Sequence, residues 1–331
     1  MTLGEKAKVG ELLSSLTKGG DVDAAYHSDA VIHASWPWGD QKGPAITDFW
    51  VNITRAFPDA ERRDMIRVGG DNRDDPRLPG PRAPHLVACL GVLQATFLQP
   101  FLGIPPTQST VHLRVAEAHW LDGGKLRESW MIIDLVDFLD QVGLNPLPRS
   151  FGNPGLWPGP ATGDGIRPDT KDWAGPDALD TVFAMHSALM SFDGVDLNSM
   201  DHAAYWTDDF MYYAAGGIGM MRGLQGFRAH HQIPFLRAFP DRRSQGHFIR
   251  VSDGAYAVTG GTVVATHTGP WLGMAPTGRL AELPVFDFYR LDGTKIAENW
   301  LPADVAGCAA GLGNDLLARA RHYAGIHPKE L

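Results

Sequence analysis

The sequence predicts an α+β fold that is present twice, and three observations lead to this prediction. Short segments recur in the same order in the two halves of the 331-residue chain, which is long for a single hydrophobic core. In each half, helical patterns come first and long strand-like runs follow. A stretch rich in proline and glycine, typical of a linker, lies between them. We therefore expect a first domain over residues 1–145, a linker over 146–177 and a second domain over 178–331.

Three pairs of matching segments carry the repeat. They are RAFPD at Arg55–Asp59 and Arg237–Asp241, LGIPPT at Leu102–Thr107 with LGMAPT at Leu272–Thr277, and KLRESW at Lys125–Trp130 with KIAENW at Lys295–Trp300. The interval between the first and second segments is 12 residues longer in the first half. The extra residues lie in Gly69–His85, whose Pro, Gly and Asp content predicts an exposed loop.

The second half shows the order of elements most clearly. We expect helices near Ala178–Phe192 and Leu197–Trp206, a strand at Asp209–Ala215, and a helix over Gly223–Phe239 that Pro240 ends. Three strand-like runs, rich in β-branched and aromatic residues, follow at Ala255–Gly269, Leu280–Leu291 and Lys295–Asp304. This order predicts a curved antiparallel sheet wrapped around helices.

Composition and charge exclude several classes of protein. The net charge is −9 and no run of Lys or Arg is present, so we expect neither nucleic acid nor an anionic membrane surface as a partner. Cys89 and Cys308 are too few for a disulfide framework, which indicates a reducing compartment. No apolar stretch resembles a signal peptide or a membrane span. We therefore expect a cytoplasmic protein.

The order of the motifs resembles the SnoaL-like polyketide cyclase branch of the nuclear transport factor 2-like superfamily. Tyr205–Gly313 carries nearly the whole pattern, including FPD, THTG, LG-x-x-PT and E-x-W, whereas Tyr26–Gly143 has TFLQ in place of THTG. The resemblance implies two tandem cones, each with an apolar pocket, in which LG-x-x-PT is the turn between two long strands. It also implies an internal pseudo-dimer packed through the outer sheet faces, where Trp130 and Trp300 should lie, and leaves a further homo-oligomer open.

The sequence departs from this family at the residue that the resemblance implies for catalysis. Cyclases of this type use an Asp on the last strand as general acid/base, paired with a His on the preceding strand. Those positions hold Leu301 and Asp287 in the second half, and Met131 and Glu117 in the first. The usual Asp is therefore absent twice, but each half keeps an inward carboxylate on the neighbouring strand.

Strand alternation predicts which other side chains face the cavity of the first half. His119 should lie beside Glu117, and Ser129 beside Met131. His33 on an early strand should face the same cavity, with Trp36 and Trp38 of the segment SWPWGD nearby. A carboxylate and an imidazole in an apolar cavity could act as general acid and base. Alternatively Glu117 and His119 form a satisfied polar pair, or the alternation is inverted and both face solvent.

In the second half the same alternation sends Asp287, Tyr289, Tyr212 and Asn299 inward, beside Leu301. The two hydroxyls could bind a carbonyl or phenol while Asp287 takes a proton. The alternative is that the tyrosines only fill space. We expect no metal: His230 and His231, with His247 or His267, could be imagined as ligands, but adjacent histidines on a helix point about 100° apart.

These observations predict a cofactor-independent enzyme that transfers a proton on a small, hydrophobic, oxygenated molecule, aromatic or polyketide-like. The reaction could be that of a cyclase, isomerase, dehydratase, hydrolase or C–C lyase. The alternative is a non-catalytic protein that binds a hydrophobic ligand and uses one half only as a structural partner. Charged groups that converge in a closed pocket would favour the enzyme, because a passive binder has little reason to bury them.

Overall fold

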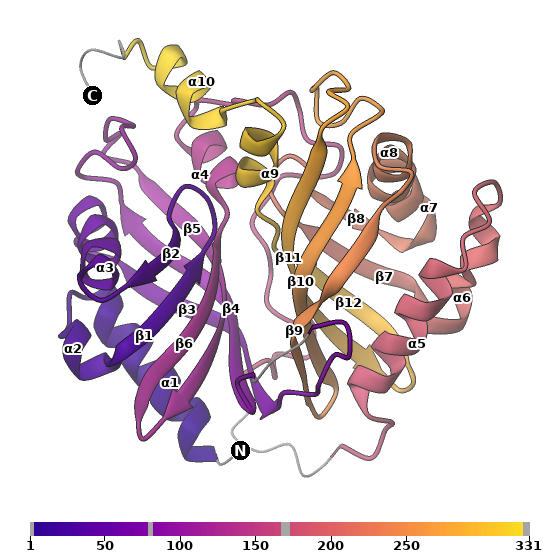
Figure 1. Ribbon diagram of the computed structural model, residues 1–331, viewed down its shortest axis with the longest axis horizontal. Coiled ribbons are helices and arrows are strands. Elements are labelled where there is room, and N and C mark those ends of the chain that lie inside the picture. The colour runs from indigo at the N-terminus through magenta and orange to yellow at the C-terminus, as the bar shows by residue number, and fades with distance from the viewer. Residues whose placement is uncertain (1–2, 79–81, 167–172, 327–331) are drawn as a thin grey trace.

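The computed structural model describes residues 3–78, 82–166 and 173–326, which form two six-stranded sheets of the same strand order (Figure 1). The orders are β2-β1-β6-β5-β4-β3 and β8-β7-β12-β11-β10-β9, so the predicted repeat is confirmed. The first sheet consists of β1 (Tyr26–Ala34), β2 (Gly39–Lys42), β3 (Glu61–Asp71), β4 (His85–Thr96), β5 (Thr110–Asp122) and β6 (Lys125–Ile133). The second consists of β7 (Trp206–Ala214), β8 (Met220–Arg222), β9 (Arg243–Asp253), β10 (Tyr256–Thr266), β11 (Leu280–Asp292) and β12 (Lys295–Leu301).

Both sheets are mixed, whereas the sequence predicted purely antiparallel ones. Strand β1 pairs with β6 in parallel, β7 pairs with β12 in parallel, and the other pairs are antiparallel. The reason is topological: a helix and four strands separate β1 from β6 along the chain, so no hairpin fixes their relative direction. This pairing places the first strand of each half next to the last strand, in the interior of the sheet.

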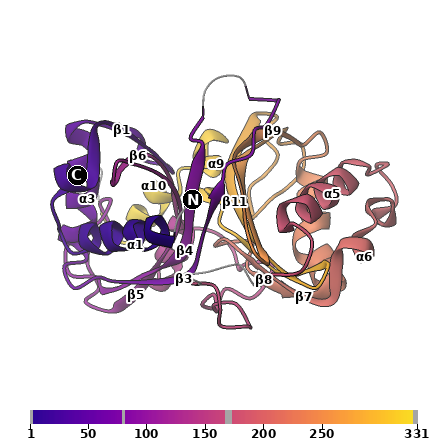
Figure 2. The same cartoon turned by 90° about the horizontal axis from the view of Figure 1, so that it is seen from below.

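Helices cover the outer flank of each sheet, and the sheets stand back to back in the middle of the molecule (Figures 1 and 2). The described helices of the first half are α1 (Leu3–Thr17), α2 (Val22–Ala25), α3 (Pro44–Ala56) and α4 (Leu135–Gln141). Those of the second half are α5 (Ala178–Met190), η1 (Leu197–Met200), α6 (His202–Tyr205), α7 (Gly223–Phe227), η2 (Arg228–Gln232), α8 (Ile233–Ala238), α9 (Val305–Gly311) and α10 (Leu316–Tyr323). None of the described helices has the length and apolar composition needed to cross a bilayer.

The repeated LG-x-x-PT segments form the same turn in both halves, as the sequence predicted. Leu102 and Leu272 have φ angles of 52° and 48°, and the glycines after them, Gly103 and Gly273, both have 76°. Glycine adopts this left-handed region without strain, which explains its place in the motif. Each turn lies between the two longest neighbouring strands, β4 and β5 or β10 and β11.

Alternate residues of the central strands enter two different cores. Met131 and Tyr289 belong to the core between sheet and helices, whereas Ala118 and Trp300 belong to a second core between the two sheets. The expected outer-face position of the tryptophans is therefore correct. Trp300 is 0% exposed, while Trp130 is half-buried and stacks on Phe248 of the other half with ring centroids 5.4 Å apart.

Two equivalent aspartates link the halves reciprocally. Asp134 of the first half accepts a hydrogen bond from the backbone N–H of Gly216 at 2.8 Å. Asp304 of the second half accepts one from the backbone N–H of Trp36 at 2.7 Å. Both aspartates also cap the helix that follows their sheet, α4 or α9. The contact between the halves thus repeats the symmetry of the sequence.

The insertion Gly69–His85 is not an exposed loop throughout, and that prediction was wrong for its first part. Asn72 and Asp75 are buried, because they bind the edge strand β9 of the second half. The Asn72 side chain accepts a hydrogen bond from the backbone N–H of Arg250 at 2.9 Å. The Asp75 carboxylate accepts one from the backbone N–H of His247 at 2.8 Å. Its polar composition therefore serves cross-domain hydrogen bonds rather than solvent contact. We call residues 72–78 the clasp.

Candidate functional site

The inner face of the first sheet holds a buried carboxylate that is already paired. Glu117 on β5 is 1% exposed and contacts the guanidinium of Arg62 on β3. Arg62 also pairs with Asp64, whose oxygen lies 2.7 Å from its Nε atom. Asp64 also pairs with the guanidinium of Arg67, so two carboxylates and two cations balance their charges within the protein.

The pairing decides the protonation state of Glu117. Burial acts to raise its pKa, but the adjacent Arg62 and His119 lower the pKa to about 2. Glu117 is thus a carboxylate at every physiological pH and a weak base. His119 lies beside it, with its Nε2 atom 3.9 Å from Glu117 and its Nδ1 atom 2.9 Å from the Ser129 hydroxyl. The alternative interpretation, a polar pair of Glu117 and His119, fits the contact between the two side chains, although the Nε2 atom of His119 makes no hydrogen bond within the described residues.

The equivalent carboxylate of the second sheet has no such partner. Asp287 on β11 is partly buried, and within the described part of the chain no basic side chain forms an ion pair with it. Asn299 on β12 donates a hydrogen bond to its Oδ1 atom at 3.1 Å. Burial raises the pKa of Asp287 to about 7, and hydrogen bonds from Asn299 and Tyr289 offset only part of the rise. At neutral pH this carboxyl group therefore exchanges readily between its acid and base forms.

Strand pairing shows why the two carboxylates differ. Glu117 lies opposite Cys89, and Asp287 lies opposite Thr259. Four residues further along these strands, Leu93 faces Arg62 and Val263 faces Ser244. Ser244 thus occupies the place of Arg62, and the second cone lacks the cation that holds Glu117 ionised.

Two tyrosines flank Asp287, and each has a histidine partner. The Tyr289 hydroxyl lies 3.1 Å from Nε2 of His186 on α5, and the Tyr212 hydroxyl lies 3.2 Å from Nε2 of His231 on η2. Burial and the nearby Asp287 raise the pKa of both tyrosines well above 10. Burial lowers the pKa of His186 to about 3 and that of His231 to about 4, so both imidazoles are neutral. Uncharged hydrogen-bonding groups therefore surround a single titrating carboxyl.

A cross-domain contact reaches this cluster from the clasp. The ring of His186 stacks on that of His247 on β9, with centroids 5.3 Å apart. The Nδ1 atom of His247 lies 3.0 Å from a guanidinium nitrogen of Arg77, and its backbone N–H binds Asp75. The first half thus holds one side of the second half's polar cluster.

Three aromatic residues of the first half do not lie where the sequence analysis placed them. His33 was expected to face the cavity, but it lies on the outer face, where it stacks on Trp130 and contacts Asp40 and Glu128. The error is one residue: Ile32 pairs with Ser129 on the inner face, just as Tyr212 pairs with Asn299. His33 therefore does not face the cavity of the first half.

Trp36 and Trp38 are also separate from the carboxylate. The half-buried Trp36 lies against α9 of the second half, where its Cβ is 2.8 Å from the position a Cβ would take at Gly307. Trp38 packs against Phe49 and Phe101, with ring centroids 5.4 and 6.0 Å away. Both side chains thus contribute to packing. Met131 and Leu301, at the positions of the usual family Asp, are 2% and 7% exposed and lie in the inner core.

Sequence patterns did not predict the ion pair of Arg62, the contact of His186 with Tyr289, or the orientation of His231 toward Tyr212. Arg62 is followed by a second arginine at the start of a strand, and such a charged pair is typical of side chains exposed to solvent. His231 was considered only as a metal ligand, and among the described residues no group of three or more His, Cys, Asp or Glu side chains could hold a metal ion. The one available signal was that the helix before FPD carries two histidines in the second half and none in the first.

Comparison with known families matches residues 190–312 to the SnoaL-like polyketide cyclase model. These residues lie in the second half of the chain, which we call the SnoaL-like half. A search among curated proteins finds no significant match. Solved structures similar to part of this chain include IdmH from Streptomyces antibioticus, whose assignment as a polyketide cyclase is provisional. It is 22% identical, with a TM-score of 0.35, over 42% of this chain and 98% of its own.

Two further similar structures carry no reaction in their descriptions. TsrD from Streptomyces laurentii is 21% identical, with a TM-score of 0.34, over 41% of this chain and 96% of its own. A nuclear transport factor 2-like protein from Burkholderia thailandensis is 16% identical, with a TM-score of 0.34, over 41% of this chain and 98% of its own.

Proposed function

We propose that the SnoaL-like half is an enzyme that uses Asp287 as a general acid/base on a small, hydrophobic, oxygenated substrate. The observation that carries the proposal is the state of Asp287: a partly accessible carboxyl, unpaired within the described residues, with a pKa raised to about 7. Burying a carboxyl group without a cationic partner lowers the stability of the fold, because burial penalises the ionised form. Such a group is therefore more readily explained by a function than by a contribution to stability. Groups with perturbed pKa values of this kind concentrate at functional sites.

The neighbours of Asp287 suit proton removal from a carbon next to a carbonyl group. The carboxylate would take the proton, and the electron pair of the broken C–H bond would move to the carbonyl oxygen as an enolate. Tyr212 and Tyr289, both neutral, could donate hydrogen bonds to that oxygen. In a substrate with a neighbouring C=C bond, Asp287 could return the proton to the far carbon of the extended enolate; alternatively the enolate could attack a second carbonyl within the substrate, whose oxygen then takes the proton from Asp287. The first outcome is an isomerisation and the second is an aldol-type cyclisation.

The first half takes a structural role in this proposal. Glu117 is paired with Arg62 and has a pKa lowered to about 2, which makes it a poor base. A specific observation favours a second candidate function, a non-catalytic binder: Leu301 stands where the family's usual Asp is expected. The two candidates differ in one measurable property, the acceleration of proton exchange.

Exchange of the C1 protons of 2-tetralone for deuterium in D₂O tests the proposal without knowledge of the natural substrate. This bicyclic ketone has acidic C–H bonds beside its carbonyl group, and NMR follows its exchange. The wild-type protein should accelerate exchange over buffer, and Asp287→Asn should lose about 10²- to 10⁴-fold of that rate, the usual contribution of a positioned acid/base.

The matched control is Glu282→Gln, which removes an exposed carboxylate from the same strand. It should leave the exchange rate within about twofold. If the wild-type protein binds 2-tetralone without accelerating exchange, or if Asp287→Asn and Glu282→Gln exchange equally fast, the binder is the better description.

A further inference from the structure

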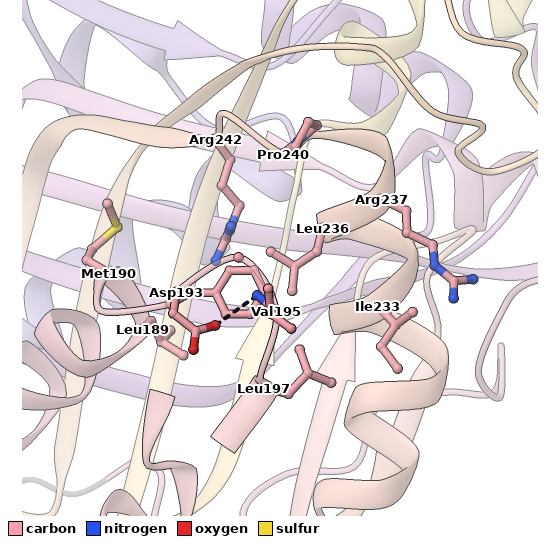
Figure 3. Close-up of a pocket in the computed structure, with 12 residues that line it drawn as sticks. Leu189, Met190, Asp193, Val195, Leu197, Ile233, Leu236, Arg237, Pro240 and Arg242 are labelled. Carbon is pink, nitrogen blue, oxygen red and sulfur yellow. Dashed lines mark hydrogen bonds between the residues drawn. The ribbon is translucent and has the colours of Figure 1, made fainter. Parts of the chain in front are cut away.

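A cavity of about 650 Å³ opens on the helical side of the SnoaL-like half (Figure 3). It lies between the end of α5, the segment that leads to η1, and α8. Apolar side chains, among them Leu189, Phe192, Ile233 and Leu236, form its lining together with two arginines and one aspartate. This volume and composition suit an organic molecule of the size of two or three fused rings.

Neither arginine of the lining, Arg237 or Arg242, forms an ion pair within the described residues, but only Arg242 is partly buried. Arg242, directly before β9, is half-buried, and its guanidinium carbon lies 6.0 Å from the ring centroid of Phe192. Within the described part of the chain no carboxylate forms an ion pair with it, and burial lowers its pKa from the ordinary arginine value. Figure 3 shows its guanidinium directed among the lining residues, whereas Arg237 points away. A partly desolvated cation of this kind is stabilised when an anion binds beside it.

The one acid of the lining does not neutralise Arg242. Asp193 accepts hydrogen bonds from the backbone N–H groups of Val195 and Asp196, at 2.8 and 2.7 Å, and so closes a turn. These bonds hold the pKa of Asp193 below its usual range. Its carboxylate therefore stabilises the wall of the cavity rather than the guanidinium.

Arg242 also connects the cavity with the cluster around Asp287. Besides burial, the charge of Arg242 contributes to the low pKa of His231. His231 in turn binds the hydroxyl of Tyr212, whose pKa Asp287 raises.

We propose that this cavity binds an amphipathic organic anion, an apolar ring system that carries a carboxylate, with the carboxylate on Arg242. This binding does not depend on the proposed function. Arginine suits the task because its planar guanidinium can donate two parallel hydrogen bonds to a carboxylate.

Two fluorescent probes of the same shape test the charge requirement. 8-Anilinonaphthalene-1-sulfonate is an anion, and N-phenyl-1-naphthylamine is the same ring system without the sulfonate. The wild-type protein should bind the anion more tightly. Arg242→Met should weaken anion binding by about 10- to 100-fold, the range of a hydrogen bond to a charged group, and change binding of the neutral probe by less than about threefold. Competition by 2-naphthoate, but not by 2-naphthamide, should show that a carboxylate is accepted.

Two control variants separate the charge of Arg242 from a general disturbance of the cavity. Arg237→Met removes the arginine that points away and should leave both probes within about twofold, while Arg242→Lys should retain part of the preference and show that the fold is intact. Equal weakening of both probes by Arg242→Met, equal effects of the two Met variants, or no anion preference in the wild type would overturn the inference. Asp287→Asn should not change probe binding, so a failed exchange assay would leave this result standing.

Discussion

At the scale of the residue, one substitution between the repeats sets the chemistry of each cone. Arg62 balances Glu117 in the first half, and Ser244 stands in its place in the second. Buried carboxylates with and without a cation differ strongly in pKa, and here the values are about 2 and about 7. The repeat therefore yields one inert ion pair and one titrating acid from the same position on the sheet.

Removal of the Arg62 cation tests this assignment. Arg62→Leu should destabilise the protein by about 3–5 kcal/mol, because it leaves Glu117 buried without its partner. It should also raise the pKa of Glu117, which a ¹³C-labelled carboxyl would show by NMR. The double variant Arg62→Leu/Glu117→Gln should recover part of the stability, as no charge remains unpaired. Equal stability of the single and the double variant would contradict the buried pair.

The raised pKa of Asp287 makes its contribution to stability depend on pH. Its pKa rises from 3.8 in the unfolded chain to about 7 in the folded protein. The folded state thus binds the proton more tightly, and this contribution is complete below pH 3.8 and is lost as the pH rises through 7. Each pKa unit corresponds to about 1.4 kcal/mol, so the loss is at most about 4 kcal/mol and is reduced by residual solvent contact.

Urea unfolding of the wild type and of Asp287→Asn at pH 5, 6, 7 and 8 measures this effect. The Asn side chain does not titrate, so the stability of the wild type relative to the variant should fall across this range and level off above pH 7. A difference that is constant with pH would show that Asp287 is ionised throughout.

Strand alternation was enough to place the inner-face residues of the central strands, because the side-chain period is a local property of the chain. It failed at His33, where the starting register of a strand that begins after a helix had to be guessed. The ion pair of Glu117 and the partners of Tyr212 and Tyr289 depend on which strands and helices become neighbours. These long-range contacts cannot be derived from the local patterns of a single sequence.

At the scale of the element, the helix predicted over Gly223–Phe239 is interrupted by a π-helical segment, η2. Pro234 explains the interruption, because it has no N–H to donate to the preceding turn and its ring crowds the carbonyl there. The wider turn carries His230 and His231, and it directs His231 to Tyr212. Pro234 is present in the predicted helix, but the sequence did not predict that α8 would begin there after a π-helical segment.

The clasp is the element that differs most between the halves, and Asp75 holds it in place. Asp75 accepts the backbone N–H groups of Arg77 and His247 and also pairs with the Arg77 guanidinium. Burial acts to raise the pKa of Asp75, but these hydrogen bonds hold it well below its usual range. Asp75→Ala should therefore cost about 2–3 kcal/mol of unfolding free energy, the value of lost hydrogen bonds to a charged group.

Asp74→Ala, at the exposed neighbour, is the control and should change stability by less than about 0.5 kcal/mol. Since the pKa of Asp75 is depressed in the folded state, its contribution is present above pH 3.8 and is lost as the pH falls further. The cost of Asp75→Ala should accordingly shrink in acid. A cost that is equal at pH 7 and pH 3 would mean that the charge of Asp75 does not hold the clasp.

At the scale of the whole molecule, the two cones share a core and should unfold together. The sequence predicted contact between the outer sheet faces, and Trp300 shows its extent: it is fully buried, stacks on Tyr213, and donates a hydrogen bond from Nε1 to the carbonyl of Pro158 at 3.1 Å. Clasp and reciprocal aspartate contacts, which the sequence did not predict, add polar links. Neither outer sheet face could remain exposed to water without a large cost in apolar surface.

Each half carries one buried, free cysteine, and these thiols report on the two cones separately. Cys89 lies in the first half and Cys308 in the second, at 0% and 2% exposure. In rising urea, labelling of the two thiols, followed by peptide mass spectrometry, should have the same midpoint if the halves unfold as one unit. Trp300→Ala should destabilise the protein by about 3–5 kcal/mol through the cavity it leaves, and should shift both midpoints equally. A shift confined to Cys308 would show instead that the second cone unfolds on its own and that the shared core does not couple the halves.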